Sequence, residues 1–440
     1  MAIVMELIGV SVKPIVGKAL SAKDLVPDGF LDDESRRRIS GQRWYHLDFG
    51  HGIENRSLSE SEFYTPTTHD VGKVLSLEWA GEVIFHTEPV IRFPLPPNPR
   101  QMIQVNNSSN APSFTGPSFT VVTFNVLTDE CARPEQYPNC PSFALSWKYR
   151  RENLLKEILQ CDADIICLQE VQVNHYYEFF YRELAKLGYE GLFKGKERTW
   201  QAGPNDGCAT FYKKNQFDLV KQWWIRLSRY HFDNIALNCI LSLKSTSQRL
   251  CIANTHIHAN PNNSEEKLGQ VYCLLKEMEK YDVPRVICGD FNSLPGSAPH
   301  SLLTKGYAHP SNKRYLYYDS KQLAKKIHHT LPLASAYSSY FQCDVAQVDI
   351  EKKMNGETRE PRFTNFVQNF KGTMNFKGTL DYIFYTTLNL KVVSLMELVD
   401  EEEVKDGALP SRTRSSDHIA IAAEFKLHRA RNWRGQFAFG

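Results

Sequence analysis

Residues 285–293 read RVICGDFNS, and in them a strand-like run passes directly into a group of polar residues. The run at 285–288 is typical of a buried strand. Asp290 and Asn292 flank Phe291, so both project to the same side of an extended chain. An unpaired amide or hydroxyl in such a place costs about 2–7 kcal/mol, and a charge costs more. We therefore expect Asp290 and Asn292 to share a cation and a substrate.

Five more segments have the same construction, with a polar residue inside or at the end of an apolar run. They read TFNVL at 123–127, LQEV at 168–171, NTHIH at 254–258, LDYIF at 380–384 and SSDH at 415–418. A shared divalent cation and a phosphate would satisfy all of these groups at once. Oxygen ligands with one imidazole and no cysteine suit magnesium or manganese better than zinc. The six segments together predict a metal-dependent phosphodiesterase.

Each of these residues also has an ordinary structural explanation when it is taken alone. Asn125 is more often a turn residue, and a strand histidine such as His256 is more often a satisfied core residue. Glu170 at a strand end is equally well explained by hydrogen bonds to loop amides. Six such segments in this order and spacing favour the functional interpretation.

Composition limits the class of protein. The 440 residues can bury a sizeable core, and the net charge of +2 means that any nucleic-acid surface must be a local patch. No apolar run reaches the roughly 18–20 residues of a membrane span. The ten cysteines form no C-x-x-C pair, and Cys167, Cys239, Cys251 and Cys288 lie in apolar runs. Buried free thiols favour a reducing compartment, so we expect a cytoplasmic protein, with the nucleus as a second compartment.

Four regions can be separated along the chain. Residues 1–92 hold short alternating runs and predict a small β-rich module, and residues 93–118 are rich in Pro, Asn and Ser and predict a linker. In residues 119–428 strands alternate with amphipathic helices, and residues 429–440 form a tail. Many strands with interspersed helices and few regular βαβ repeats predict an α+β fold, a two-sheet β-sandwich flanked by helices.

Within the third region the apolar pattern places individual elements. Strands are expected at 119–126, 164–168, 208–212, 235–243, 250–256, 285–288, 380–385, 391–397 and 419–425. Helices are expected at 147–160 and 178–187, and another is expected to start with Ser264 as its N-cap.

The six segments closely resemble those of the endonuclease/exonuclease/phosphatase superfamily. Within it, the chain is similar to poly(A) deadenylases of the carbon-catabolite-repressor type, relatives of nocturnin and the Angel proteins. The resemblance covers about residues 119–425 and includes CPSFALSW at 140–147 and DGCATFY at 206–212. It implies a sandwich with its site at one end. It also implies an enzyme, a Mg²⁺-dependent 3′-to-5′ exoribonuclease that shortens poly(A) tails and releases 5′-AMP.

The resemblance also implies a set of metal ligands. Glu170 would hold one magnesium ion, with Asn125, Asp290 and His418 around a second, and Mn²⁺ would substitute for Mg²⁺. Two cations at such a site neutralise charge on the phosphate and lower the pKa of an attacking water. The sequence therefore predicts two-metal hydrolysis of a phosphodiester.

Further catalytic roles follow from the same resemblance. His256 would contact the scissile phosphate, while Asp381 and Asp417 would orient site water or His418. Either His418 or Asp290 would take the proton of the attacking water, and the sequence does not decide between them.

Recognition of adenine is expected to rest on other residues. By resemblance, Asn292 and Phe376 sandwich the terminal base and Pro261 lies near it, with Asn254 and Asp206 completing the substrate-binding set. Stacking of a base on an aromatic ring is worth about 1–3 kcal/mol. Without the family context, an aromatic residue such as Phe376 is more often explained by core packing.

A tandem duplication leaves two aromatic residues open for the stacking role. FKGTMN at 370–375 is followed by FKGTLD at 376–381, so Phe370 is the alternative to Phe376. We favour Phe376, because it keeps the family spacing to Asp381. The segment at 223–234 is shorter than the matching family loop.

Partners and alternative functions complete the expectations. The expected partner is poly(A) RNA, and the sequence shows no leucine-rich repeat, so association with the Ccr–Not complex would need an adaptor. Alternative activities are a nocturnin-like NADP(H) 2′-phosphatase or a 2′,5′-phosphodiesterase. A different class of function is an inactive RNA-binding scaffold. Basic residues near the motifs are candidates for an RNA track: Lys194, Lys196, Arg198, Lys371 and Lys377.

Overall fold

The computed structural model describes residues 8–9, 14, 20–21, 42–48, 52–53, 57–61, 63–79, 83–90, 97–106, 116–196, 206–227, 234–308, 327–371, 374–404 and 408–428. The chain forms two compact units, Met1–Leu95 and Pro96–Gly440. The expected tail at 429–440, parts of the expected linker (93–96 and 107–115) and Arg198 lie outside the described residues.

The first unit is built on a β-sheet. Its strands follow the order β1-β7-β6-β3-β4, with bounds Ile8–Gly9, Val83–Pro89, Val74–Trp79, Arg43–Asp48 and Gly52–Ile53. A second pair joins β2 (Leu20–Ser21) to β5 (Phe63–Tyr64), and a 3-10 turn, η1, spans Thr68–Asp70. The buried carboxylate of Asp70 accepts hydrogen bonds from the Thr67 amide and the Tyr64 hydroxyl, so this turn is held from both sides.

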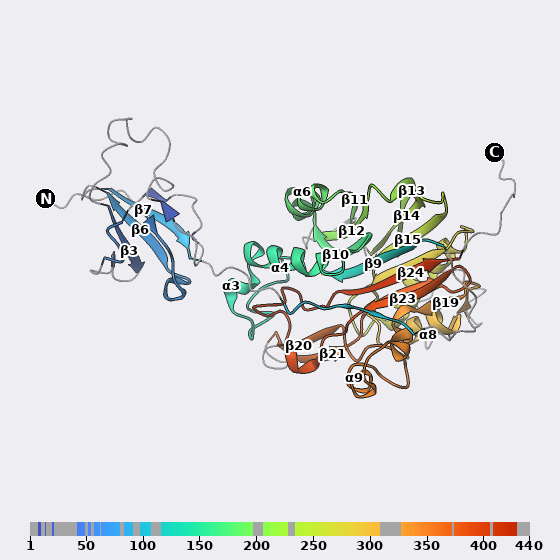
Figure 1. Ribbon diagram of the computed structural model, residues 1–440. Coiled ribbons are helices and arrows are strands. Elements are labelled where there is room, and N and C mark those ends of the chain that lie inside the picture. The colour runs from blue at the N-terminus through green and yellow to red at the C-terminus, as the bar shows by residue number, and fades with distance from the viewer. Residues whose placement is uncertain are drawn as a thin grey trace. The chain divides into compact units, whose positions relative to one another are not determined.

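The second unit contains two large mixed sheets (Figure 1). The seven-stranded sheet has the order β11-β12-β10-β9-β24-β23-β8, with bounds Tyr189–Gly195, Asp206–Lys213, Ile165–Gln172, Ser118–Asn125, Ile421–Leu427, Leu390–Met396 and Met102–Gln104. The six-stranded sheet has the order β13-β14-β15-β16-β22-β19, with bounds Phe217–Arg226, Ile235–Leu243, Arg249–His256, Arg285–Asp290, Asp381–Thr386 and Leu333–Ser335.

Helices and short hairpins complete the second unit. The helices are α3 (Ser142–Leu145), α4 (Trp147–Leu159), α5 (Val173–His175), α6 (Tyr181–Lys186), α7 (Ser264–Met278), α8 (Ala298–Lys305) and α9 (Gln347–Lys353). A π-helical turn, η2 (Tyr176–Phe180), joins α5 to α6, and 3-10 turns lie at η3 (Ala336–Gln342) and η4 (Glu401–Glu403). Two-stranded pairs are β17 (Tyr307–Ala308) with β18 (Ile327–His328) and β20 (Asn365–Phe370) with β21 (Met374–Gly378).

Three apolar layers hold this unit together. Residues of both sheets, such as Cys167 and Ile252, meet in a central layer between them. The outer face of the seven-stranded sheet packs on α4 and α6, and the outer face of the six-stranded sheet packs on α7 and α8. Burial of apolar surface on both faces of both sheets is the main favourable term for this arrangement. The predicted α+β sandwich flanked by helices is confirmed.

Some local expectations were wrong. The helix expected from residue 178 starts at Val173, because the α5, η2 and α6 segments are continuous. Ser264 is the first helical residue of α7, and the N-cap is Asn263, whose backbone is the last outside the helix. Strand β13 includes Trp223–Arg226, part of the segment treated as a loop, while 228–233 lie outside the described residues.

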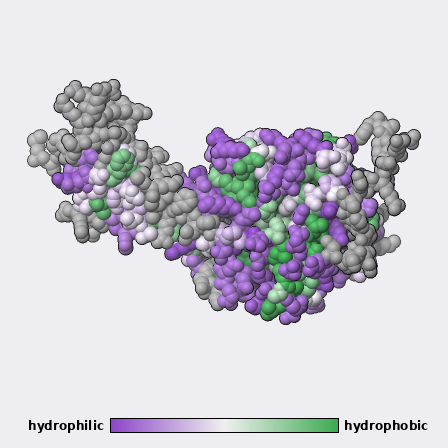
Figure 2. All heavy atoms as spheres, viewed as in Figure 1, coloured by the Kyte–Doolittle hydropathy of each residue, from purple (hydrophilic) through white to green (hydrophobic). Residues whose placement is uncertain are grey.

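Other expectations hold for the described residues. All ten cysteines are free, and the four expected in apolar runs are buried. Within the ranges that the structure covers, no helix is long and apolar enough to cross a membrane. Hydrophilic residues cover most of the visible face of the second unit, with hydrophobic residues in smaller areas between them (Figure 2).

Candidate active site

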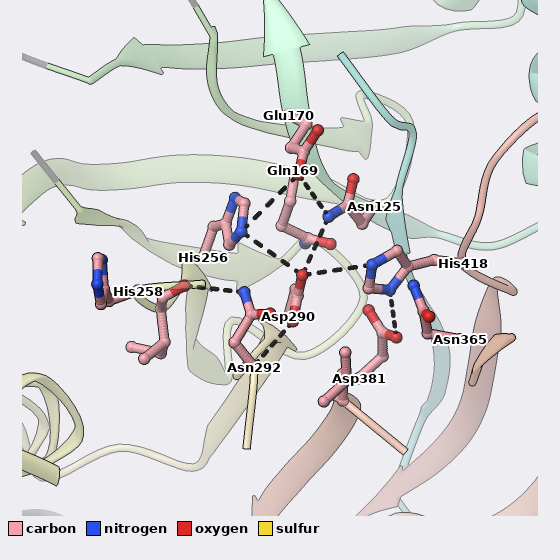
Figure 3. Close-up of polar contacts among 12 residues, drawn as sticks. Asn125, Gln169, Glu170, His256, His258, Asp290, Asn292, Asn365, Asp381 and His418 are labelled. Carbon is pink, nitrogen blue, oxygen red and sulfur yellow. Dashed lines mark hydrogen bonds and ion pairs between the residues drawn. The ribbon is translucent and has the colours of Figure 1, made fainter. Parts of the chain in front are cut away.

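Several strands of the two sheets end at the same place. In the seven-stranded sheet β9 ends at Asn125, beside the segment of β10 that carries Glu170. In the six-stranded sheet His256 ends β15 opposite Asp290 at the end of β16, and Asp290 pairs with Asp381 at the start of β22. Figure 3 shows these side chains pointing toward one another from the two sheets.

The carboxylate of Asp290 lies at the centre of the group. Its Oδ2 lies 3.0 Å from Asn125 Nδ2, 3.5 Å from His256 Nε2 and 3.6 Å from His418 Nε2. Glu170 Oε1 lies 3.1 Å from Asn125 Nδ2 and 3.9 Å from His256 Nε2. The structure thus brings together five residues, each selected from a different sequence segment.

Unusual backbone conformations aim these side chains. Glu170, Leu127 and Asn292 have φ of 58°, 56° and 46°, in the left-handed region that non-glycine residues seldom adopt. Hydrogen bonds stabilise two of them: Thr128 N donates to Glu170 Oε2 at 2.8 Å, and Asn292 N donates to Asp290 Oδ1 at 2.8 Å. Strained residues of this kind concentrate at functional sites.

His418 is oriented by Asp381. Its Nδ1 lies 2.7 Å from Asp381 Oδ2, and the same oxygen accepts a hydrogen bond from Thr364 Oγ1 at 2.7 Å. Asp417 has other partners, since its Oδ2 accepts from Tyr137 OH at 2.8 Å and from Asn365 Nδ2 at 3.4 Å. The orienting role expected for both aspartates therefore corresponds to a direct contact for Asp381 alone.

The two histidines differ in charge. Burial lowers the pKa of His256 to about 4, and the nearby ammonium of Lys196 acts in the same direction, so the imidazole is neutral at pH 7. Burial would also lower the pKa of His418, but the carboxylates of Asp381 and Asp290 outweigh it and raise that pKa well above 6.5.

The carboxylate of Asp290 has a raised pKa. Burial is the main cause, and the negative charge of Asp381 adds to it, while the two imidazoles act in the opposite direction. A buried acid beside a second acid is costly to ionise unless positive charge is supplied.

The chemistry of the donor set fits a divalent cation. Ligand atoms of Asp290, Asp381 and His418 lie within 4.8 Å of one another. Among the described residues, the buried Asp381 Oδ1 has no hydrogen-bond partner, so an acceptor is left unused. Carboxylate oxygens with one imidazole match the preferences of Mg²⁺ and Mn²⁺.

Asn125 was expected to bind a metal ion, but its side-chain contacts in the structure are hydrogen bonds to other protein groups. Its Nδ2 donates to both Glu170 and Asp290, while its Oδ1 accepts from Leu127 N at 3.0 Å. In this orientation the amide is a donor that sets the spacing of the two carboxylates, and its oxygen is already used.

A pocket of about 340 Å³ opens beside this group. Three residues expected at the substrate line it, Asn292, Pro261 and Phe376, together with Asp417, which was expected to orient site water or His418. The side chain of Phe370, the alternative for base stacking, lies outside the described part of the chain.

Two residues expected at the substrate lie elsewhere. Asn254 is fully buried, and its Nδ2 donates to Leu168 O at 3.1 Å and Ala209 O at 2.9 Å, so it ties the two sheets together. Asp206 is also buried and forms an ion pair with Lys196 at 2.6 Å. Asp206 acts on the site through charge, because it is among the groups that affect the pKa of His256.

Sequence reasoning missed Arg150, which joins two parts of the site. Its buried guanidinium donates to Val126 O at 3.2 Å, Leu127 O at 2.6 Å and Ser415 O at 2.8 Å. A signal was present, because Arg150 lies at helical spacing with Leu154 and Ile158 on the buried face of α4. An arginine in that row needs acceptors inside the protein.

Comparisons with known proteins give one family match and several similar proteins. The family model described as Endonuclease/Exonuclease/phosphatase family matches residues 122–418. The chain is 38% identical over 429 residues to carbon catabolite repressor protein 4 homolog 2 of Arabidopsis thaliana, covering 82% of this chain and 69% of that protein.

A fungal protein and a solved structure extend these findings. The chain is 30% identical over 424 residues to the CCR4-Not complex 3′-5′-exoribonuclease subunit Ccr4 of Mycosarcoma maydis, covering 83% of this chain and 60% of that protein. The fold is similar to that of ANGEL2, described as a 2′,3′-cyclic phosphatase, with a TM-score of 0.61 and 26% identity, covering 75% of this chain and 99% of that chain.

Proposed function

The chain belongs to the endonuclease/exonuclease/phosphatase family, and from this premise we propose that it is a Mg²⁺-dependent 3′-to-5′ exoribonuclease that removes poly(A) tails. The observation that carries the proposal is the convergence of Glu170, Asp290 and His418 beside a pocket that Phe376 lines. Similarity to a protein named as a 3′-5′-exoribonuclease supports the choice of reaction.

The residues that would hold divalent ions are Glu170, Asp290 and His418, with Asn125 fixing the spacing of the two carboxylates. Bound cations supply charge neutralisation at the phosphate and a lower pKa for the attacking water. The raised pKa of Asp290 supports this assignment, because the site needs added positive charge to keep that carboxylate ionised.

The reaction is the hydrolysis of one phosphodiester. The water oxygen bonds to phosphorus, the bond from phosphorus to the 3′-oxygen of the preceding nucleotide breaks, and that oxygen takes a proton. Neutral His256 faces the site with its Nε2 and would hold the scissile phosphate. Asp290 and His418 both remain candidates for the group that takes the proton from water.

The terminal adenine would lie in the pocket of about 340 Å³. Phe376 offers an aromatic face for stacking, worth about 1–3 kcal/mol. Release of the cleaved unit gives 5′-AMP, since the phosphate stays with the nucleotide whose base the pocket holds.

The test is a tail-shortening time course with purified protein and Mg²⁺. We expect a 3′-oligoadenylate tail to be removed faster than a mixed sequence, and a chelator to stop the reaction. Glu170→Ala should reduce the rate at least about hundredfold, because the loss of a metal carboxylate removes charge stabilisation. Intact oligoadenylate with both the native protein and Glu170→Ala would overturn the proposal and leave the scaffold function.

A second candidate is a 2′,3′-cyclic phosphatase, which the likeness to ANGEL2 favours. The same metal-binding groups would serve that reaction, so the substrate panel has to separate the two. We expect faster turnover of 3′,5′-linked oligoadenylate than of its 2′,3′-cyclic phosphate end, 2′,5′-linked adenylate or NADPH. Faster turnover of a cyclic end would favour the second candidate.

We further propose that the protein acts in the cytoplasm as a member of a CCR4-Not complex. The support is the similarity to a subunit of that complex. An adaptor would provide the contact, since the sequence shows no leucine-rich repeat. Co-purification of the full chain with complex subunits is the test, and its absence after crosslinking would refute membership.

A further inference from the structure

The pocket beside the metal-binding group contains buried polar groups that the proposed chemistry leaves unused. Among the described residues, the hydroxyl oxygens of Ser293 and Ser297 are buried without a hydrogen-bond partner. Lys267 is 6% exposed, and its ammonium donates one hydrogen bond, to Asn292 O at 2.5 Å. An ammonium carries three donors, so one acceptor does not satisfy it. All three side chains line this pocket.

Two of these groups come from the starts of helices. Lys267 lies in the first turn of α7, and Ser297 is the N-cap of α8. The Ser297 side chain makes no capping hydrogen bond, although serine at this position usually makes one. Helix N-termini carry partial positive charge, which adds to that of Lys267. This part of the pocket therefore favours a ligand that accepts hydrogen bonds.

The rest of the lining suits a flat apolar ring. Phe376 and Val367 come from the β20–β21 hairpin, and Leu380 and Pro261 add further apolar surface. A ligand that combines a flat ring with hydrogen-bond acceptors on its edge is a nucleobase. An ordinary structural role for Lys267, holding the Asn292 carbonyl, accounts for one of its donors and for neither serine.

We propose that Lys267, with Ser293 and Ser297, reads the hydrogen-bonding edge of the terminal base and selects adenine against guanine; this rests on the proposed function. Adenine has an unprotonated ring nitrogen, N1, on its Watson–Crick edge, whereas guanine has an N–H at that position. The ammonium cannot accept a hydrogen bond, so a guanine N–H facing it leaves two donors opposed. Specificity then comes from repulsion of the wrong base as well as attraction of the right one.

The test measures nucleotide binding separately from hydrolysis. Titration calorimetry with the full chain compares 5′-AMP with 5′-GMP, which differ only in the base. We expect the native protein to prefer AMP by about tenfold or more, the usual size of one such base contact. Lys267→Met should weaken AMP binding about tenfold and GMP binding much less, so that the ratio between the two falls.

Two further variants control for structural damage. Ser293→Ala removes a hydroxyl that forms no hydrogen bond to another described residue. It should lower the ratio of AMP affinity to GMP affinity by a few fold. Lys280→Met, at an exposed lysine just after α7 whose side chain is 66% exposed, should leave both affinities unchanged. An unchanged ratio in both Lys267→Met and Ser293→Ala, or equal native affinities for AMP and GMP, would overturn the inference.

Hydrolysis assays on tails ending in A or G separate this inference from the proposed function. Preferential AMP binding without any RNA hydrolysis would refute the exonuclease and leave the base-reading site standing. Hydrolysis of A- and G-ended tails at equal rates would refute the base-reading site and leave the exonuclease standing.

Discussion

At the scale of single residues, the site depends on how each charged side chain is held. Asp381 lies between Thr364 and His418, with 2.7 Å to each, and it supplies the negative charge that contributes most to raising the pKa of His418. Asp290 Oδ1 accepts from Asn292 N, while its Oδ2 is shared by the Asn125 amide and two imidazoles. Asp381 Oδ2 is therefore fixed for the orientation of His418, whereas Asp290 Oδ2 is open to a ligand.

Replacing Asp381 tests this division. Asp381→Asn keeps the shape but removes the charge that orients His418, so we expect hydrolysis of oligoadenylate to fall by about 10²–10⁴-fold. The rate is measured at saturating Mg²⁺, with circular dichroism to check folding. Asp282→Asn, at an exposed position, is the matched control and should keep the native rate. A native rate for Asp381→Asn would contradict the orienting role.

At the scale of elements, the close approach of β15 and β16 positions His256 beside Asp290. Gly289 has φ of +139°, and a Cβ on it would lie 1.9 Å from Thr255 O, so only glycine fits between these strands. The strand ends that carry the site are thus set by backbone contact as well as by side chains.

Alanine at two glycines gives opposite predictions. Gly289→Ala should lower the free energy of unfolding by about 1–3 kcal/mol or more, because the added methyl forces the strands apart. Gly269→Ala in α7, where a Cβ meets nothing within 4 Å, should raise it by about 0.5–1 kcal/mol. Urea denaturation of both variants measures the change. Equal stability of Gly289→Ala and the native protein would refute the steric argument.

The strands also show how much of the fold can be predicted from the sequence. Apolar runs predicted β9, β14 and β24, which are buried on both faces. Strand β13 was missed, because it lies at the edge of its sheet and most of its side chains are exposed. The apolar pattern of a sequence indicates which segments are buried, and an edge strand with exposed side chains shows little of that pattern.

The sequence also predicted part of the candidate site and missed the rest. Chemistry at strand ends identified Glu170, Asp290 and His418, and the resemblance to the family is confirmed by the match over residues 122–418. The role of Asn254 was not predictable, because its acceptors, Leu168 O and Ala209 O, belong to the other sheet. Residues that act through packing between elements are visible only once those elements are placed.

At the scale of the whole molecule, the described site residues all belong to the second unit. The segment at 97–106 is part of that unit as well, since Arg100 is buried and bonds to Glu157 Oε1 at 3.1 Å. The first unit has its own sheet and its own buried apolar side chains, among them Trp44, Leu77 and Phe85. Each unit therefore has what a domain needs to fold by itself.

Removing Met1–Leu95 tests the independence of the second unit. We expect residues 96–440 to fold cooperatively and to hydrolyse oligoadenylate within about threefold of the full-chain rate, because a domain with its own core keeps its site. Thermal unfolding and a time course measure both properties. A folded but inactive fragment would show that the first unit takes part in catalysis.

Stability should depend on pH through His175. This ring stacks on Trp147 at 3.6 Å between centroids, and burial lowers its pKa to about 4. Between pH 6.5 and 4 the unfolded chain takes up a proton that the folded protein does not, so stability falls as pH falls. Between pH 7 and 5 we expect His175→Phe to lose about 1 kcal/mol less stability than the native protein, allowing for partial exposure.

Urea midpoints at pH 7 and pH 5 give this comparison directly. His328→Gln, at an exposed histidine, is the control and should show the same pH dependence as the native protein. The same loss of stability in His175→Phe and in the native protein would contradict the prediction.

The position of β24 determines when the seven-stranded sheet can be completed during synthesis. This strand lies between β9 and β23, and the loop before it supplies His418 and the Ser415 carbonyl that Arg150 holds. In order of synthesis β24 is the last described strand, so the place between β9 and β23 is filled only when residues 421–427 have been made. The group formed by Glu170, Asp290 and His418 is therefore complete only after the last described strand has been synthesised.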